Sequence, residues 1–197
     1  MTEVLQIEYI TSLEIKAWHN TRMSVSQSGR SQVADYGGGY FEIDLETSLP
    51  RNIAKHITAF LGARHGGGER FKLCLPGILD SSSNYNGTIA VSGANQAGSL
   101  LNVNAAINKT ILKAGDYISL DSHDKVYQVT GDVTTDGSGN AVIHVSPDLV
   151  TAPIDDDAVI YRDVPLMVVY TGDTVSYSYS PYRNVPMSLS FREAWKT

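Results

Sequence analysis

Residues 112–149, LKAGDYISLDSHDKVYQVTGDVTTDGSGNAVIHVSPDL, constrain the fold of this chain more than any other stretch. Apolar and polar residues alternate in GDYISLD, again in KVYQVTG and again in NAVIHVS, which is the period of a half-buried β-strand. The segment Asp136-Gly137-Ser138-Gly139-Asn140 supplies residues that tolerate the positive φ angles of a tight turn. The stretch therefore predicts three short strands joined by turns, and its pattern is not typical of a catalytic segment.

This block lies inside a second β pattern. Before it, Phe41, Ile43 and Leu45 share one face of the segment YFEIDLE, as expected for a half-buried antiparallel strand. After it, PLMVVY, VSYSYS and VPMSLSFREAW return to simple alternation and are expected to pair with the N-terminal strands. We therefore predict a discontinuous outer domain of residues 1–82 and 163–197, with a small barrel inserted at residues 83–162.

Further strands are expected in both parts. The barrel should contain the segments TIAVSG, SLLNVNA, DYISLD, VYQVT and AVIHVS. Residues 4–16 predict one or two strands. GERFKLCLP at residues 68–76 predicts another, with Phe71, Leu73 and Leu75 on one face, that stops at Pro76. The Ser-rich residues 22–36 predict a strand edge or a flexible hairpin.

One helix is expected after the strand YFEIDLE. Ser48 is a candidate cap, Pro50 suits the first turn, and Gly62 or Gly66 suits the end. The apolar stripe of this helix has the spacing i, i+4, i+7 and i+8 and consists of Ile53, Ile57, Phe60 and Leu61. A helix with one apolar stripe is expected to cover a face of the sheet.

Composition argues against several classes of partner. The formal net charge is −6 and the chain has no run of Lys and Arg, so specific binding of nucleic acid is not expected. No window approaches 18 consecutive apolar residues, so no membrane span is expected. The first residues lack a basic region followed by an apolar one, so we expect no signal peptide and synthesis in the cytoplasm.

The motifs that could carry chemistry are incomplete. His65-Gly66-Gly67-Gly68 resembles an oxyanion loop, but no Ser has Gly two residues before and two after it, and a Gly-rich helix exit explains the segment better. Asp132, Asp136 and the run 155–157 lack the alternating ligands and late Glu of a calcium loop. The histidines lack zinc-ligand spacing, and no phosphate-binding Gly motif occurs. We therefore assign no catalytic, cofactor-binding or metal-binding residue and do not expect an enzyme.

The aromatic residues near the C-terminus are the remaining site candidates. Tyr177, Tyr179 and Tyr182, with Trp195, predict a protein interface. Core packing and a sugar-stacking face are the alternatives for the same residues.

Two strings resemble a known family. GGGYFEIDLETSLPRNIAKHITAFLGARHGGGERFKLCLPG resembles a segment of distal tail proteins (Dit) from long-tailed siphophages: a strand, a helix with an aromatic-Leu pair (Phe60-Leu61), a Gly-rich turn and a strand ending in Pro76. The inserted strings VSGANQAGSLLNV, LKAGDYISL and VYQVTGDVTTDGSGNAVIHVSPDL are similar to the variant that carries an OB-like barrel. The resemblance covers nearly the whole chain and is weakest over residues 1–36.

The resemblance implies a mainly β fold, an antiparallel β-sandwich with one helix plus an inserted small OB-like β-barrel. It also implies a structural virion protein that forms a homohexameric ring at the distal end of the tail tube. The implied partners are the tail tube protein on one side and the tip or baseplate hub with its fibre-bearing proteins on the other, while DNA passes through the lumen.

Two other functions remain open at this stage. One is a glycan-binding module that contacts the host surface, because OB-like barrels often bind oligosaccharides. The inserted segment shows no aromatic-plus-basic platform, so only weak glycan contact is expected. The other is an envelope hydrolase whose two carboxylates meet from distant strands.

Overall fold

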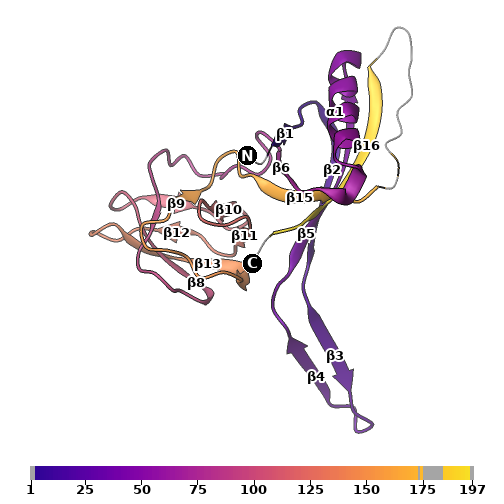
Figure 1. Cartoon of the computed structure of the whole chain (residues 1–197). Helices are drawn as coiled ribbons and strands as arrows, with labels where there is room; N and C mark the ends of the chain where they lie inside the picture. Colours follow the sequence, from indigo (N-terminus) through magenta and orange to yellow (C-terminus); the bar gives the residue numbers. More distant parts are fainter. Residues whose placement is uncertain (1–2, 173, 175–183, 196–197) are drawn as a thin grey trace.

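A computed structural model describes residues 3–172, 174 and 184–195 of the chain. The described chain is mainly β, with one α-helix and several sheets that include a nearly closed, barrel-like sheet. This confirms the predicted fold class. Figure 1 shows two lobes side by side and a β-hairpin that extends away from both.

The first lobe, here called the sheet lobe, is a six-stranded sheet with the order β1-β6-β15-β16-β5-β2. Its strands are β1 (Val4–Gln6), β2 (Ile10–Trp18), β5 (Tyr40–Leu49), β6 (Phe71–Cys74), β15 (Leu166–Tyr170) and β16 (Val185–Glu193). As the alternation predicted, the C-terminal strand β16 pairs antiparallel with β5, with Leu189 opposite Leu45 and Phe191 opposite Ile43. The pair β1–β6 is parallel, which the sequence pattern did not predict.

The predicted helix forms as α1 (Arg51–Ala63) and packs on the sheet lobe (Figure 1). Ile57 and Leu61 are buried in the core of this lobe, so the apolar stripe is confirmed. The expected cap was wrong. Ser48 lies inside β5, where it pairs with Pro186, and the residue before the helix is Pro50, without a side-chain cap. The strand runs through Leu49 because its buried side chain belongs to the sheet's core, so only Pro50 separates strand from helix.

The helix also ends differently from expectation. It passes Gly62 and stops at Ala63, and the left-handed residue after it is His65, with φ 51°. The short 3₁₀ turn η1 (Gly66–Gly68) follows. A Cβ on Gly67 would lie 2.5 Å from the carbonyl oxygen of Tyr170, so the Gly-rich segment allows a close approach of two backbones. This packing role agrees with the helix-exit interpretation of the His65-Gly66-Gly67-Gly68 motif.

The second lobe, here called the barrel lobe, has the strand order β14-β10-β11-β13-β8-β7. Its strands are β7 (Ala90–Val91), β8 (Gly98–Asn104), β10 (Tyr117–Leu120), β11 (Val126–Val129), β13 (Asn140–Leu149) and β14 (Val159–Ile160). A bridge between Ala90 and Ala158 links the two ends of this sheet. A separate pair, β9 (Thr110–Leu112) with β12 (Val133–Thr134), completes the lobe. The five strands expected from the sequence all form; β9, β12 and β14 were not expected.

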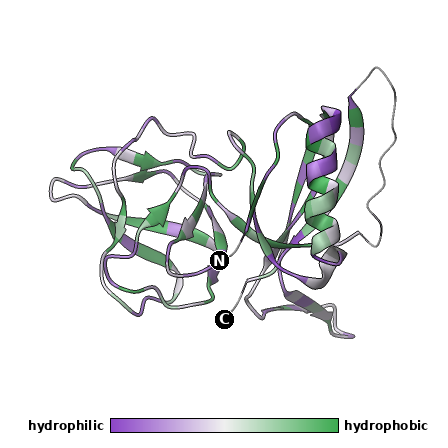
Figure 2. Ribbon diagram, turned by 45° about the horizontal axis from the view of Figure 1, so that its top comes forward, coloured by the Kyte–Doolittle hydropathy of each residue, from purple (hydrophilic) through white to green (hydrophobic). Residues whose placement is uncertain are grey.

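Each lobe has its own hydrophobic core. Figure 2 shows apolar residues along the strands of both lobes. Two residues of the barrel lobe cross this division: Val126 of β11 is buried in the core of the sheet lobe, and Tyr117 of β10 packs against that core. The two lobes therefore meet along β10 and β11.

The hairpin between β2 and β5 consists of β3 (Thr21–Val25) and β4 (Ser31–Asp35). All residues of both strands are exposed. This segment, 21–35, is called the arm below.

Candidate functional site

The arm exposes an apolar face. Met23 pairs directly with Val33, and Val25 follows Met23 by two residues, so the three side chains lie on one face of the ribbon. Their exposed fractions are 62%, 67% and 65%. A two-stranded hairpin is only marginally stable in water, and no described strand or helix of the two lobes covers the apolar face of this one (Figure 1). The arm is therefore suited to packing against another molecule.

The opposite face of the arm is polar. Arg22, Ser24 and Gln32 lie on it. The shallow groove there, of about 470 Å³, is lined by these three residues with Val33, Ala34 and Tyr36. The arm is thus an amphipathic ribbon with one apolar and one polar face.

The body of the protein sets the direction of the arm. Strands β2 and β5, which lead into and out of the arm, pair with each other in the sheet lobe. At the base the Tyr36 amide donates to the Asn20 carbonyl (2.9 Å). Gly37 and Gly38 then take positive φ angles of 68° and 72°, which a glycine adopts without a steric penalty. These two residues let the chain leave β4 at an angle and enter β5.

The two lobes are joined by a buried ion pair. The Lys125 ammonium lies 2.5 Å from the Glu193 carboxylate, and the side chains are 1% and 0% exposed. The carboxylate also accepts hydrogen bonds from the backbone amides of Phe41 in β5 (3.1 Å) and Val126 in β11 (2.9 Å). Glu193 therefore binds strands of both lobes at once.

Aromatic rings surround the Lys125 ammonium. Its Nζ lies 4.4 Å from the Trp195 ring centre, 4.9 Å from Phe41 and 5.9 Å from Tyr127. Such rings attract a cation through their electron-rich faces. Burial lowers the pKa of Lys125 and raises that of Glu193, because both charges lose water, while each charge opposes the shift of the other.

The predicted interface residues fall into two groups. Tyr177, Tyr179 and Tyr182 lie outside the described residues, so their role stays a prediction. Trp195 is half-buried over Lys125, at the junction of the lobes. The sequence did not indicate Lys125 or Glu193, since nothing in the local pattern links two residues that are 68 positions apart. The segment of the arm was expected as a strand edge or a flexible hairpin but not as a site, although the alternation in RMSV and SQVAD was a usable signal.

Asp132, Asp136 and Asp155, three of the acidic residues in the calcium-like segments, accept backbone amides. Asp155 accepts the Gly93 amide, Asp132 accepts the Ala114 amide, and Asp136 accepts two amides of its own turn. These bonds, first of all the one from Asn140, lower the pKa of Asp136. Within the described part of the chain, no three His, Cys, Asp or Glu side chains gather as a metal site would require.

Comparison with known proteins gives no assignment. No protein-family model matches the chain, and no curated protein matches it. Among the described residues, no helix has both the length and the apolar character needed to cross a membrane.

Proposed function

We propose that this chain is a structural subunit of a long-tailed bacteriophage tail, which forms a ring at the distal end of the tail tube. The ring is hexameric and joins the tube to the tip or baseplate hub and its fibre-bearing proteins. Residues 1–82 with 163–197 form the ring domain, and residues 83–162 form the inserted OB-like barrel. The mature protein resides in the virion, and it has no enzymatic activity.

The arm is the observation that carries this proposal. Its apolar face of Met23, Val25 and Val33 extends away from the lobes that could cover it (Figure 1). Exposed apolar surface of this kind marks protein contacts. The partner is a second copy of the chain. Each arm packs on the next subunit, and such head-to-tail contacts produce a ring when the rotation closes.

The charge and the lobe junction support the same function. A net charge of −6 disfavours adhesion of DNA to the lumen through which it passes. The buried pair Lys125–Glu193 holds the two lobes together. A connector between tube and tip needs its two lobes in a fixed relative position, because the sheet lobe forms the ring and the barrel lobe faces a neighbouring protein.

Two matched substitutions on β4 test the ring. Val33→Lys adds a charge to the apolar face of the arm, and Gln32→Lys adds the same charge to the polar face next to it. Light scattering over a concentration series, with negative-stain images of the most concentrated samples, gives the assembly state. We expect six-fold rings for the wild type and for Gln32→Lys, and monomers for Val33→Lys.

Either of two results would contradict the proposal. One is a wild-type chain that stays monomeric at every concentration reached. The other is equal assembly of both variants, which would place the contact elsewhere on the molecule.

A further inference from the structure

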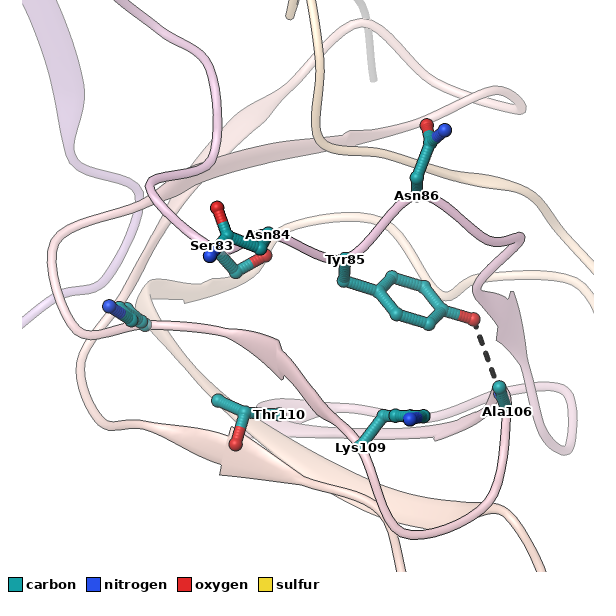
Figure 3. A pocket seen from close by; sticks show the side chains of 8 residues that line it. Ser83, Asn84, Tyr85, Asn86, Ala106, Lys109 and Thr110 are labelled. Carbon is teal, nitrogen blue, oxygen red and sulfur yellow. Dashed lines mark hydrogen bonds between the residues drawn. The ribbon is translucent and has the colours of Figure 1, made fainter.

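A cleft of about 530 Å³ lies on the barrel lobe, between residues 83–86 and the segment that carries Ala106, Lys109, Thr110 and Lys113. Figure 3 shows Tyr85 on one side of it, with Lys109 and Thr110 on the other. In the sequence, Tyr85 belongs to a polar connection and is 24 residues from Lys109. The fold brings together an aromatic ring and basic side chains that are distant from each other in the sequence.

The Tyr85 ring is held in a fixed position. Its hydroxyl donates to the Thr88 carbonyl (3.0 Å) and accepts from the Ala106 amide (3.2 Å; Figure 3). Arg162 donates to the Tyr85 carbonyl (2.7 Å). A Cβ on Gly87 would lie 2.3 Å from the Tyr85 hydroxyl, so the ring passes close over this glycine. A ring fixed in this way loses little conformational freedom when a ligand stacks on it.

The backbone beneath the two lysines is fixed as well. The Lys109 amide donates to the Thr135 hydroxyl (2.9 Å), and the Lys113 amide donates to the Asp116 carboxylate (2.8 Å). Thr135 and Asp116 are themselves buried. The segment between these two lysines is therefore attached to the body of the barrel lobe at both ends.

The polar ends that face the cleft are free. Asn84, Asn86, Lys109 and Lys113 are exposed, and their side chains make no hydrogen bond or ion pair with any described residue. No described Asp or Glu lines the cleft, in a chain whose net charge is −6. A fixed wall with free amide and ammonium groups is suited to a ligand that is rich in hydroxyl groups and carries a negative charge.

We propose that this cleft binds an acidic saccharide, a unit with a carboxylate or phosphate group on a sugar ring. The sugar ring lies against the face of Tyr85, the amides of Asn84 and Asn86 bind its hydroxyl groups, and the ammonium groups of Lys109 and Lys113 hold the acidic group. The proposal goes beyond the ring function and does not depend on it, because the cleft and the arm belong to different lobes.

Single-stranded nucleic acid fits the same cleft less well. It is bound by several aromatic residues in series along a basic groove that follows the phosphates. This cleft has one aromatic residue, Tyr85, and two lysines among its lining residues. The electrostatic part of the affinity for nucleic acid grows with the number of phosphates that the protein neutralises, and two lysines neutralise only a few phosphates.

The test is isothermal titration of the full-length protein with defined probes. The probes are trigalacturonic acid, neutral galactotriose, glucose 6-phosphate, neutral glucose and oligothymidylate. We expect trigalacturonic acid to bind at least about tenfold more tightly than galactotriose. The comparison of trigalacturonic acid with glucose 6-phosphate, each against its neutral sugar, distinguishes a carboxylate from a phosphate as the acidic group.

Substitutions locate the binding. Lys109→Gln and Lys113→Gln each remove one exposed charge from the cleft and should weaken binding about tenfold. Lys55→Gln removes one exposed charge from helix α1 in the other lobe and should leave the affinity unchanged. The arm variant Val33→Lys should bind as the wild type does, so a failure of the ring and a failure of the cleft give different results.

Three outcomes would overturn the proposal. These are equal affinity for charged and neutral sugars, equal binding by the cleft variants and Lys55→Gln, or tighter binding of oligothymidylate than of any sugar. The last would assign the cleft to nucleic acid.

Discussion

The Lys125 ammonium, on the residue directly before β11, and the Glu193 carboxylate at the end of β16 lie 2.5 Å apart and are almost fully shielded from water. They belong to different lobes, and Glu193 also accepts amides from β5 and β11. A carboxylate with three partners from two lobes fixes their relative position in a way that apolar contact alone would not, because hydrogen bonds have direction.

Loss of Glu193 should be costly. Glu193→Ala leaves the buried Lys125 ammonium and two backbone amides without an acceptor, and removal of one partner of a buried ion pair costs about 3–5 kcal/mol. Arg192→Ala, one residue earlier, removes a partly exposed pair with Glu42 and should cost about 1 kcal/mol or less. Urea unfolding of both variants gives the two free energies. Equal losses would show that Glu193 does not join the two lobes.

Trp195 can act in one of two ways, by stabilising the Lys125 ammonium within the chain or by contacting another subunit. Its ring lies 4.4 Å from the Lys125 ammonium, so Trp195→Ala should lower the free energy of unfolding by about 1–2 kcal/mol, while Trp195→Phe should retain most of it. Thermal and urea unfolding measure this. If Trp195→Ala leaves stability unchanged but abolishes assembly, the residue acts at a contact between subunits instead.

His123 should make stability depend on pH. Among the described residues neither nitrogen of the His123 ring has a hydrogen-bond partner. Burial lowers the pKa of His123 below 6.5, although the charges of Asp157 and Asp124 oppose this shift. Since the unfolded chain then binds the proton more readily than the folded one, stability falls as the pH drops below about 6.5. Urea unfolding between about pH 7.5 and pH 5.5 should show this loss in the wild type and a smaller one in His123→Gln. Parallel curves for the two proteins would show that His123 does not contribute.

Substitution by Ala should change the free energy of unfolding in opposite directions at two neighbouring glycines, Gly62 and Gly67. Gly62 is in helix α1 with open space where a Cβ would go, so Gly62→Ala should stabilise by about 0.5–1 kcal/mol. At Gly67 a Cβ would lie 2.5 Å from the Tyr170 carbonyl oxygen, so Gly67→Ala should destabilise by about 1–3 kcal/mol. Thermal unfolding compares them directly. A neutral Gly67→Ala would mean that the two backbones can separate without cost.

The sequence predicted much of the fold where the pattern was local. The alternation of Phe41, Ile43 and Leu45 identified β5, and the stripe containing Ile57 and Leu61 identified α1. It was less reliable at boundaries. Ser48 looked like a helix cap because its side chain is suited to one, but pairing with β16 extends the strand through it. Tertiary pairing overrode a local preference at this position.

The candidate sites show the same contrast. The arm was visible as a hairpin, but only the structure places its apolar face away from both lobes. Tyr85 lies in a polar stretch of the sequence, and its position opposite Lys109 depends on how residues 83–88 fold back on the barrel lobe. No local pattern could indicate that, because the two residues are brought together by strands that lie between them in the sequence.

The sequence by itself determined the mainly β class, the longer strands of both lobes and the helix, because each depends on a short-range period of apolar residues. Only the tertiary structure decided the parallel pair β1–β6, the junction at Lys125 and Glu193, and the cleft beside Tyr85. These features join residues that are far apart along the chain. Their contacts depend on which strands become neighbours, and a local period specifies which face of a strand is buried without specifying its neighbour.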